Sequence, residues 1–278
     1  LDPFCLESSL MTKEIAGLFC AGQINGTSGY EEAAAQGIVA GINAVRFLNG
    51  QEPITISRSQ AYIGVLIDDL VTKGTTEPYR MMTSRAEHRL YLRMDNADAR
   101  LTPLGYEVGL ISEERYAAFT AKQEMIKREV ERLKTAPVGG DPATNALLRE
   151  IGTPELRHGV TLAELLRRPE VSYEQLGMLG ELPDLPQTVR RAVEVLVKYE
   201  GYLRKQQAAI ERFERMEERL LPKDIDYIKL RGLSREAAEK LARIRPRSLG
   251  QAARISGVSP ADVNVLMIYL ETQKWSEK

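Results

Sequence analysis

A glycine-rich stretch near the start of the chain has the residue types of a turn that binds an electron-rich group. The sequence AGQINGTSGYEEAAAQG spaces glycines among polar residues and continues into alanines. A short buried strand from Gly17 to Gly22 would lead into this turn, and a helix from about Tyr30 to Phe47 would follow it. The free N–H groups and the positive dipole end of such a helix favour an anion or an electron-rich carbonyl. The same order of elements occurs in many α/β proteins, so a purely structural turn is an equal alternative.

A second stretch, PYRMMTSRAEHRLYLR, gathers positive charge. Arg85, Arg89 and Arg93 are four residues apart, and a helix beginning near Ser84 would align them as one stripe. Arg80 precedes them in a loop. Guanidinium groups bind phosphate oxygens through paired N–H donors, so the stripe predicts RNA binding. A solvated face neutralised by ion pairs is the alternative.

Composition limits the kinds of partner and the compartment. The 278 residues include 38 Lys and Arg against 39 Asp and Glu, a formal charge of -1, so any nucleic-acid surface must be a local patch. The two cysteines, Cys5 and Cys20, form neither a disulfide framework nor a zinc pattern, and a reducing compartment fits them best. No apolar run approaches the roughly 20 residues that span a bilayer.

Helical patterns predominate after the basic stretch, and they predict a mainly α fold. Serines able to cap helices occur at Ser112, Ser234, Ser248 and Ser259. The first of these helices should run through Lys134, and TAPVGGDPAT should form a break after it. A single long helix is expected from Gln187 to Leu220, followed by a small all-helical module.

The glycine-rich stretch resembles, nearly residue for residue, the second flavin-contact motif of the tRNA-modifying flavoproteins called MnmG or GidA. SQAYIGVLIDDLVTKGTTEPYRMMTSRAEHR and GLSREAAEKLARIRPRSLGQAARISGVSPA are similar to the same family, and the resemblance is looser from Thr135 to Glu181. It implies the remnant of an α/β FAD-binding fold, of the type with two dinucleotide-binding parts, followed by an all-helical C-terminal domain. The chain opens on Leu-Asp-Pro and has no GxGxxG loop, so we expect the C-terminal portion of a longer protein.

The resemblance also implies a division into four parts. These are residues 1–57, the end of the FAD-binding domain; 58–106, a connecting region that contacts tRNA; 107–196, a helical domain; and 197–278, a long helix with a helical subdomain that docks a partner.

The resemblance assigns flavin-contacting residues to the glycine-rich stretch. Gly22 and Gln23 would approach the ribityl chain and pyrophosphate of FAD, and Gly29, Tyr30 and Glu31 would open the helix that faces the isoalloxazine ring. FAD and NADH are the cofactors expected of the intact protein. Because the GxGxxG loop is missing, we expect no stable FAD binding by this chain alone. Metal ligands are not expected.

The same resemblance strengthens the interpretation of the basic stretch as a tRNA-binding region. Arg80 and Arg89 are the first candidates, followed by Arg85 and Lys73. His88 is a poor candidate for a catalytic base. The acid, base and thiol groups of the family would lie upstream of this chain, so no catalytic residue is assigned.

In the terminal module, Arg254, Val263 and Leu266 are the candidate residues for docking the partner GTPase, MnmE. The module also contains a helix, a turn with glycine and a second helix, together with several arginines. That pattern leaves a DNA-reading helix-turn-helix open as an alternative.

The sequence therefore predicts part of an enzyme that, with MnmE, adds a carboxymethylaminomethyl group to C5 of the wobble uridine (U34) of tRNA. The resemblance further implies a cytoplasmic homodimer without membrane association, and we expect this chain alone to be inactive. Two alternatives remain: a related folate- and FAD-dependent tRNA uridine methyltransferase, which would lack so long a helical tail, and a non-enzymatic DNA-binding module.

Overall fold

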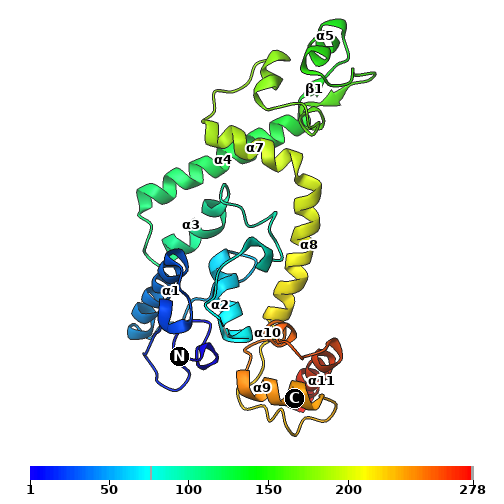
Figure 1. Ribbon diagram of the computed structural model, residues 1–278. Helices are drawn as coiled ribbons and strands as arrows, with labels where there is room; N and C mark the ends of the chain where they lie inside the picture. The colour runs from blue at the N-terminus through cyan, green and yellow to red at the C-terminus, as the bar shows by residue number, and fades with distance from the viewer. Residues whose placement is uncertain (76, 277–278) are drawn as a thin grey trace. The chain divides into compact units, whose positions relative to one another are not determined.

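The computed structural model describes residues 1–75 and 77–276, and the chain divides into two compact units (Figure 1). Unit 1 comprises Leu1–Leu92 and Ala208–Lys278, and unit 2 comprises Arg93–Gln207. Helices predominate, as the sequence predicted, and the two named strands pair as one small sheet. The predicted four-part division stays a prediction. None of the helices in the described residues is long and apolar enough to cross a membrane.

Unit 1 combines an N-terminal half with a terminal helical module. Its helices are α1 (Tyr30–Leu48), α2 (Tyr62–Lys73), the end of α8 (Glu200–Glu217), α9 (Arg235–Ile244), α10 (Leu249–Arg254) and α11 (Pro260–Ser276), with 3₁₀ turns at Pro3–Cys5, Gly22–Asn25 and Thr83–Arg85. Helices α1 and α2 pack together through a buried core that includes Leu10, Val39 and Ile67. This core holds α1 against α2, and both helices carry site residues.

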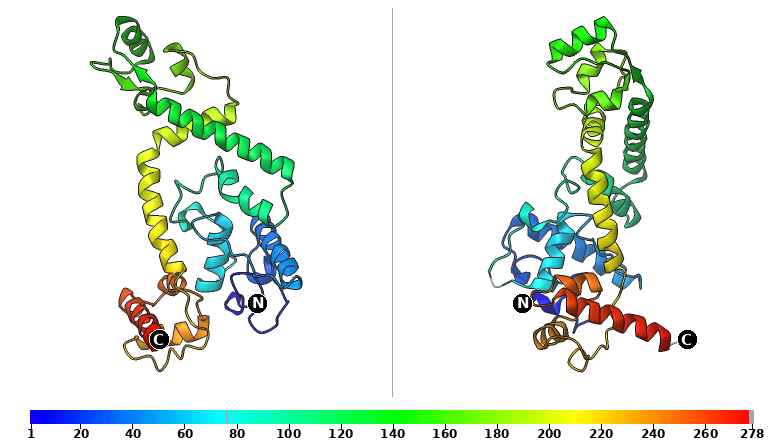
Figure 2. Two further views of the ribbon diagram at one scale, coloured as in Figure 1. Left: turned by 180° about the vertical axis from the view of Figure 1, so that it is seen from behind. Right: turned by 90° about the vertical axis from the view of Figure 1, so that its right-hand side faces the viewer.

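Unit 2 packs short helices against one long helix. It contains α3 (Ala97–Glu107), α4 (Glu113–Thr135), β1 (Pro137–Val138), α5 (Pro142–Ile151), β2 (Val160–Thr161), α6 (Leu162–Leu166), a 3₁₀ turn at Glu174–Met178, α7 (Gln187–Lys198) and the start of α8. β1 and β2 are antiparallel, and α7 packs along α4 (Figure 1, Figure 2). Val189, Val193 and Val197 form the buried face of α7, at the four-residue spacing of a helix.

Side-chain caps begin many of these helices where the sequence predicted them. Ser112 accepts a hydrogen bond from the N–H of Arg115 at the start of α4, which runs to Thr135 as expected. Ser234 and Ser248 cap α9 and α10 in the same way. These local signals are readable in sequence because a cap and the N–H group that it satisfies are only two or three residues apart.

The terminal module, residues 218–276, is closed by a buried carboxylate. Asp262 of α11 accepts hydrogen bonds from the N–H of Ser234 at 2.8 Å and from the N–H of Ser259 at 2.9 Å. Those bonds, the Ser234 backbone first and the Ser259 hydroxyl next, lower the pKa of Asp262 to about 2. Asp262 therefore ties the start of α9 to the start of α11.

The glycine turn, residues 22–29, is held by a buried polar network centred on Gln36 of α1. The Gln36 Oε1 atom accepts from the Gly22 N–H at 3.1 Å and from the Asn25 side-chain amide at 2.9 Å, and its Nε2 donates to the Thr27 hydroxyl at 2.7 Å. Gly22 has φ +83°, a left-handed conformation that favours glycine. One side chain on the helix thus fixes three points of the turn that precedes it.

Three expectations about secondary structure are wrong for identifiable reasons. The expected strand from Gly17 to Gly22 is irregular, because its backbone bonds back to the adjoining turn through Cys20 N–H to Leu10 O and Thr12 N–H to Leu18 O. The helix expected near Ser84 is only the 3₁₀ turn Thr83–Arg85 followed by irregular turns. The backbone carbonyl of Arg85 accepts a hydrogen bond from the side chain of Arg58 at 3.1 Å. That carbonyl is therefore not available for the backbone hydrogen bond of a continued helix.

The expected single helix from Gln187 to Leu220 is two helices, α7 and α8, with a break at Tyr199. Tyr199 has φ −99° and ψ 7°, outside the helical range, and Gly201 follows it. Glycine is a poor helix former and lowers the cost of such a break.

Replacing Gln36 with leucine should destabilise unit 1 by about 2 to 4 kcal/mol, because the Gly22 N–H, the Asn25 amide and the Thr27 hydroxyl each lose a partner while buried. Urea denaturation followed by circular dichroism measures this. Gln51→Leu is the matched control, since Gln51 is exposed, and it should change stability by less than about 0.5 kcal/mol. Equal effects of the two substitutions would contradict the role given to Gln36.

Asp262→Asn should lower the stability of the terminal module in a pH-dependent way. The pKa is about 2 in the folded chain and about 4 when unfolded, so the carboxylate contributes its full stabilisation, about 2 kcal/mol, above pH 4. That contribution declines as the pH falls from about 4 to about 2. Denaturation at several pH values should show the difference between wild type and variant shrinking in this window.

Asp224→Asn is the control for this experiment, because Asp224 is exposed, and it should have little effect at any pH. A difference between wild type and Asp262→Asn that stays constant down to pH 2 would refute the assignment.

Candidate functional site

The basic segment, residues 79–92, is bonded directly to the glycine turn. The Tyr79 N–H donates to the Gly26 carbonyl at 2.7 Å, and Thr27 and Tyr79 form a parallel bridge. The Met81 N–H donates to the carboxylate of Glu32 on α1 at 2.9 Å. The structure therefore brings together the two stretches that the sequence singled out, one on each side of these hydrogen bonds.

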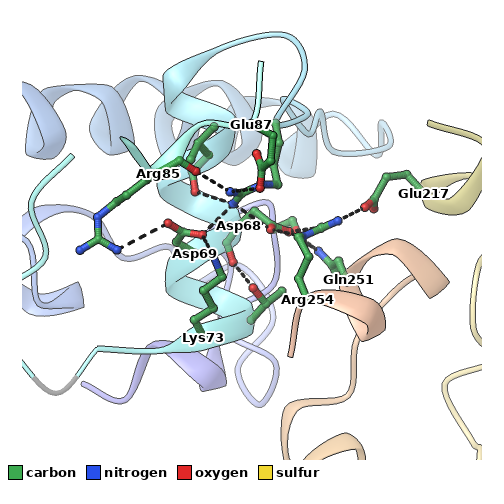
Figure 3. A network of polar contacts seen from close by, with 12 residues as sticks. Asp68, Asp69, Lys73, Arg85, Glu87, Glu217, Gln251 and Arg254 are labelled. Atoms are coloured by element: carbon green, nitrogen blue, oxygen red, sulfur yellow. Dashed lines mark hydrogen bonds and ion pairs between the residues drawn. The ribbon is translucent and has the colours of Figure 1, made fainter. Parts of the chain in front are cut away.

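A buried carboxylate, Asp69 of α2, lies beneath the basic segment. It accepts a hydrogen bond from the Tyr79 hydroxyl at 2.9 Å and forms an ion pair with Arg58 at 2.7 Å. Lys73 pairs with the same carboxylate at 2.8 Å (Figure 3). Arg85 lies 3.9 Å from the same carboxylate, with its guanidinium 4.5 Å from the centre of the Tyr79 ring. Burial opposes the charge of Asp69, but the Lys73 and Arg58 contacts outweigh it and lower the pKa.

Arg58 is the cation at the centre of this site, with a side chain only 2% exposed. Its guanidinium bonds both Asp69 and the neighbouring Asp68, and it pairs with Glu87 of the basic segment at 2.8 Å. Burial disfavours the charged guanidinium, yet the hydrogen bond to Glu87 and the nearby carboxylates raise the pKa of Arg58. Arg58 stays charged and fixes the fold of the segment through Glu87 and the Arg85 carbonyl.

The four predicted tRNA-binding residues fall into two groups. Arg80 and Arg89 are exposed, and their guanidinium groups make no hydrogen bond or ion pair within the described residues. Arg85 and Lys73 are partly exposed, at 40% and 41%, but both are drawn toward Asp69. Arg80 and Arg89 are thus free to meet a phosphate, whereas Arg85 and Lys73 also stabilise the segment.

The glycine turn offers donors for an electron-rich ligand. Gly29, the cap residue of α1, supplies no side-chain hydrogen bond, so the first N–H groups of the helix keep their capacity to donate. Of the residues predicted to contact flavin, Gln23, Tyr30 and Glu31 are exposed, and Gly22 and Gly29 are buried. These five residues therefore form a turn whose backbone N–H groups can contact a ligand and which has three exposed side chains beside it.

Two orphaned polar atoms mark the same turn. Asn25 and Glu32 are buried, and the Asn25 Oδ1 and Glu32 Oε2 atoms have no hydrogen-bond partner within the described residues. A Cβ atom on Gly29 would lie 1.7 Å from that Glu32 oxygen, so a larger residue there would require the Glu32 side chain to move. Neither Asn25 nor Glu32 was predicted from the sequence. The only signal for Glu32 was its place in the first turn of a helix, which it shares with Glu31.

The predicted partner-docking residues lie inside the protein. Val263 and Leu266 are 7% and 0% exposed and belong to the core of the terminal module. Arg254 is 12% exposed at its side chain, with both its Nε and Nη2 atoms 2.7 Å from Asp68 and a further ion pair to Glu217. These residues hold the module together and to α2, and their direct contact with a partner stays a prediction.

Other reactive side chains in this region have structural surroundings. His88 is buried against the ring of Phe213, with centroids 6.2 Å apart, and burial lowers its pKa despite the opposing charge of Glu87. Burial also raises the pKa of Cys5, and Cys20 is buried. No group of His, Cys, Asp and Glu among the described residues is arranged to hold a metal ion.

Comparison with known proteins places these features in a family. Three family models match: "Glucose inhibited division protein A" over residues 1–52, "tRNA modifying enzyme MnmG/GidA C-terminal helical domain" over 113–207, and "tRNA modifying enzyme MnmG/GidA C-terminal helical bundle" over 209–278. A crystal structure of Aquifex aeolicus GidA, form II, aligns with 97% of this chain and 42% of its own, at 43% identity and a TM-score of 0.85.

Curated relatives point to the same family. The protein named tRNA uridine 5-carboxymethylaminomethyl modification enzyme MnmG is 57% identical in Caldicellulosiruptor saccharolyticus, over 100% of this chain and 45% of the relative. Its Geobacillus thermodenitrificans counterpart is 55% identical over 97% of this chain and 43% of the relative. The chain thus spans less than half the length of these relatives. It belongs to the MnmG/GidA family and matches the part that carries the family's two C-terminal helical domains.

Proposed function

We propose that this chain is part of a FAD-dependent enzyme that, together with the GTPase MnmE, adds a carboxymethylaminomethyl group to C5 of the wobble uridine of tRNA. The names of its curated relatives support the reaction. The chain's own share is to bind tRNA through the basic segment, to supply one side of the flavin pocket and to present the terminal module to MnmE.

The observation that carries this proposal is the attachment of the basic segment to the glycine turn. The Tyr79 N–H donates to the Gly26 carbonyl and the Met81 N–H to the Glu32 carboxylate, and these bonds hold the two within one folded unit. A tRNA phosphate bound by Arg80 or Arg89 would therefore be held in a fixed relation to the turn. Modification of one base requires such fixed positioning, because a base misplaced by even about 1 Å reacts far more slowly.

The glycine turn fits an electron-rich cofactor edge. The uncapped start of α1 offers N–H donors, and the orphaned Asn25 Oδ1 and Glu32 Oε2 atoms are acceptors still without partners. Gly22, Gln23, Gly29, Tyr30 and Glu31 would be the residues of this chain that hold the flavin. FAD and NADH would supply the redox chemistry, and this chain would orient the cofactor and the bound tRNA.

Three further features belong to the proposal. The terminal module would dock MnmE through surface residues around the core that contains Val263 and Leu266, with Arg254 holding the module in place. The intact enzyme would be a cytoplasmic homodimer. The division at residues 57, 106 and 196 would separate the flavin remnant, the tRNA-contacting region, the helical domain and the docking subdomain.

The double variant Arg80→Ala, Arg89→Ala should weaken tRNA binding by about tenfold to a hundredfold at low salt, because each charge-assisted contact to phosphate contributes on the order of 1 kcal/mol or more. The slope of log affinity against log salt should also become shallower by about 1 to 2. Filter binding or fluorescence anisotropy across a salt series measures both quantities.

The matched control is Arg157→Ala, Arg231→Ala, which removes the same charge from exposed positions outside the basic segment and should retain most of the affinity. Unchanged binding by the Arg80, Arg89 variant would contradict the proposal. A DNA duplex that competes as well as tRNA would favour the helix-turn-helix alternative.

A further inference from the structure

Two neighbouring carboxylates on α2 serve opposite sides of unit 1. Asp69 forms ion pairs with Lys73 and Arg85, and Asp68 pairs with Arg254 of the terminal module (Figure 3). Asp69 also accepts a hydrogen bond from Tyr79 of the basic segment. Consecutive residues of a helix point about 100° apart, so adjacent aspartates can face different partners. The pair is therefore the meeting point of two parts of the chain that are far apart in sequence.

Arg58 joins the two carboxylates into one network. A single guanidinium nitrogen, Nη1, lies 3.2 Å from Asp68 and 2.7 Å from Asp69, while Nη2 bonds Glu87 and the Arg85 carbonyl in the basic segment. With Arg58 only 2% exposed, water cannot readily replace a lost partner. A change in the charge balance at Asp68 would therefore act on Arg58, which also holds the basic segment.

On the side of the terminal module, the network ends in close contacts between α10 and Asp68. Arg254 contacts Asp68 through two nitrogens, both at 2.7 Å, and its guanidinium lies 4.9 Å from the centre of the Phe213 ring. Gln251, one turn earlier on α10, donates to Asp68 at 3.3 Å. These hydrogen bonds from α10 to α2 thus converge on one carboxylate.

A cavity gives access to this attachment. It has a volume of about 440 Å³ and is lined by Asp68, Gln251, Arg254 and Arg58, together with Glu217 at the end of α8. The Asp68–Arg254 pair is therefore open on one side. The cavity leaves room for the Arg254 side chain to move away from Asp68.

We propose that Asp68 and Arg58 form a relay between the terminal module and the basic segment. Through it, the contact of α10 with α2 determines the conformation of the basic segment. Arg254, Asp68 and Arg58 are positioning residues in this relay, and they act on Arg85 and Glu87 and through Asp69 on Tyr79. When Arg254 pairs with Asp68, Arg58 is left to hold Asp69 and Glu87. When Arg254 withdraws, Arg58 turns toward the unpaired Asp68 and loosens its hold on the segment.

The relay concerns the conformation of the chain itself and is tested without tRNA. Its meaning for tRNA binding rests on the proposed function. A static attachment would make a different prediction, namely that loss of Arg254 loosens α10 alone and leaves the basic segment unaffected.

The experiment is hydrogen exchange of single backbone amides in wild type, Arg254→Gln and Arg254→Lys. The amides of Tyr79 and Met81, which bond the Gly26 carbonyl and the Glu32 carboxylate, report on the basic segment. We expect both to exchange about three to ten times faster in Arg254→Gln, the range typical of coupling within one polar network. Arg254→Lys keeps the charge but not the two-nitrogen contact, so its effect should be intermediate.

Arg231→Gln is the matched control. Arg231 also belongs to the terminal module, is exposed, and its guanidinium has no hydrogen-bond partner in the described residues. Exchange at Tyr79 and Met81 should stay at the wild-type rate in this variant. Amides of α4 in unit 2 should be unchanged in all variants, which separates a local effect from general unfolding.

A double-mutant cycle with Arg58→Lys adds a second criterion. If the relay runs through Arg58, the effects of Arg58→Lys and Arg254→Gln on the Met81 amide should be clearly less than additive. Wild-type exchange at Tyr79 and Met81 in Arg254→Gln, or strict additivity in the cycle, would overturn the relay. Neither result would bear on the proposed function, which the Arg80, Arg89 salt series tests separately.

Discussion

Burial of two adjacent carboxylates on α2 is the constraint on which the site depends. Asp68 and Asp69 are 8% and 2% exposed, and buried charges are tolerated only when they are paired and hydrogen-bonded. Arg58 meets part of that requirement for both residues at once. The remaining partners come from opposite directions, Arg254 from the terminal module and Tyr79 from the basic segment. The need to neutralise two charges thus decides which parts of the chain assemble around α2.

The glycine turn is built on a different principle, because it is held by neutral groups. Gln36 satisfies the turn from inside, and Gly22 adopts a backbone conformation that residues with side chains rarely take. The outer side of the turn is left with backbone donors and with exposed side chains. A neutral, rigid turn of this kind suits the binding of a cofactor edge whose charge changes, since its dipoles are already oriented before that change occurs.

Local structure was predictable from the sequence, whereas contacts between residues distant in sequence were not. The bounds of α1 and α4 and the capping serines of α9 and α10 depend on neighbours within a few residues, so they were predictable. The stripe of arginines was predicted as a helix, but Arg58, 27 residues away from Arg85, takes the carbonyl that a helix would need. The pairing of Arg254 with Asp68 was not foreseen for a similar reason, because nothing near Arg254 in sequence reveals Asp68. Asp69 and Arg58 themselves carry no local pattern, and only the fold shows that they face one another.

The division of labour among the basic side chains follows from this buried network. A cluster of arginines repels itself and holds a poorly defined conformation unless carboxylates lie among its members. Asp69 and Glu87 supply that negative charge, and they draw in Arg58, Lys73 and Arg85. Arg80 and Arg89 are left over, exposed and on a backbone that is already fixed. Less entropy is then lost when those two side chains meet a phosphate, because the segment that carries them needs no further ordering. The buried acids therefore favour the binding of an anion at the surface, although each acid taken alone would oppose it.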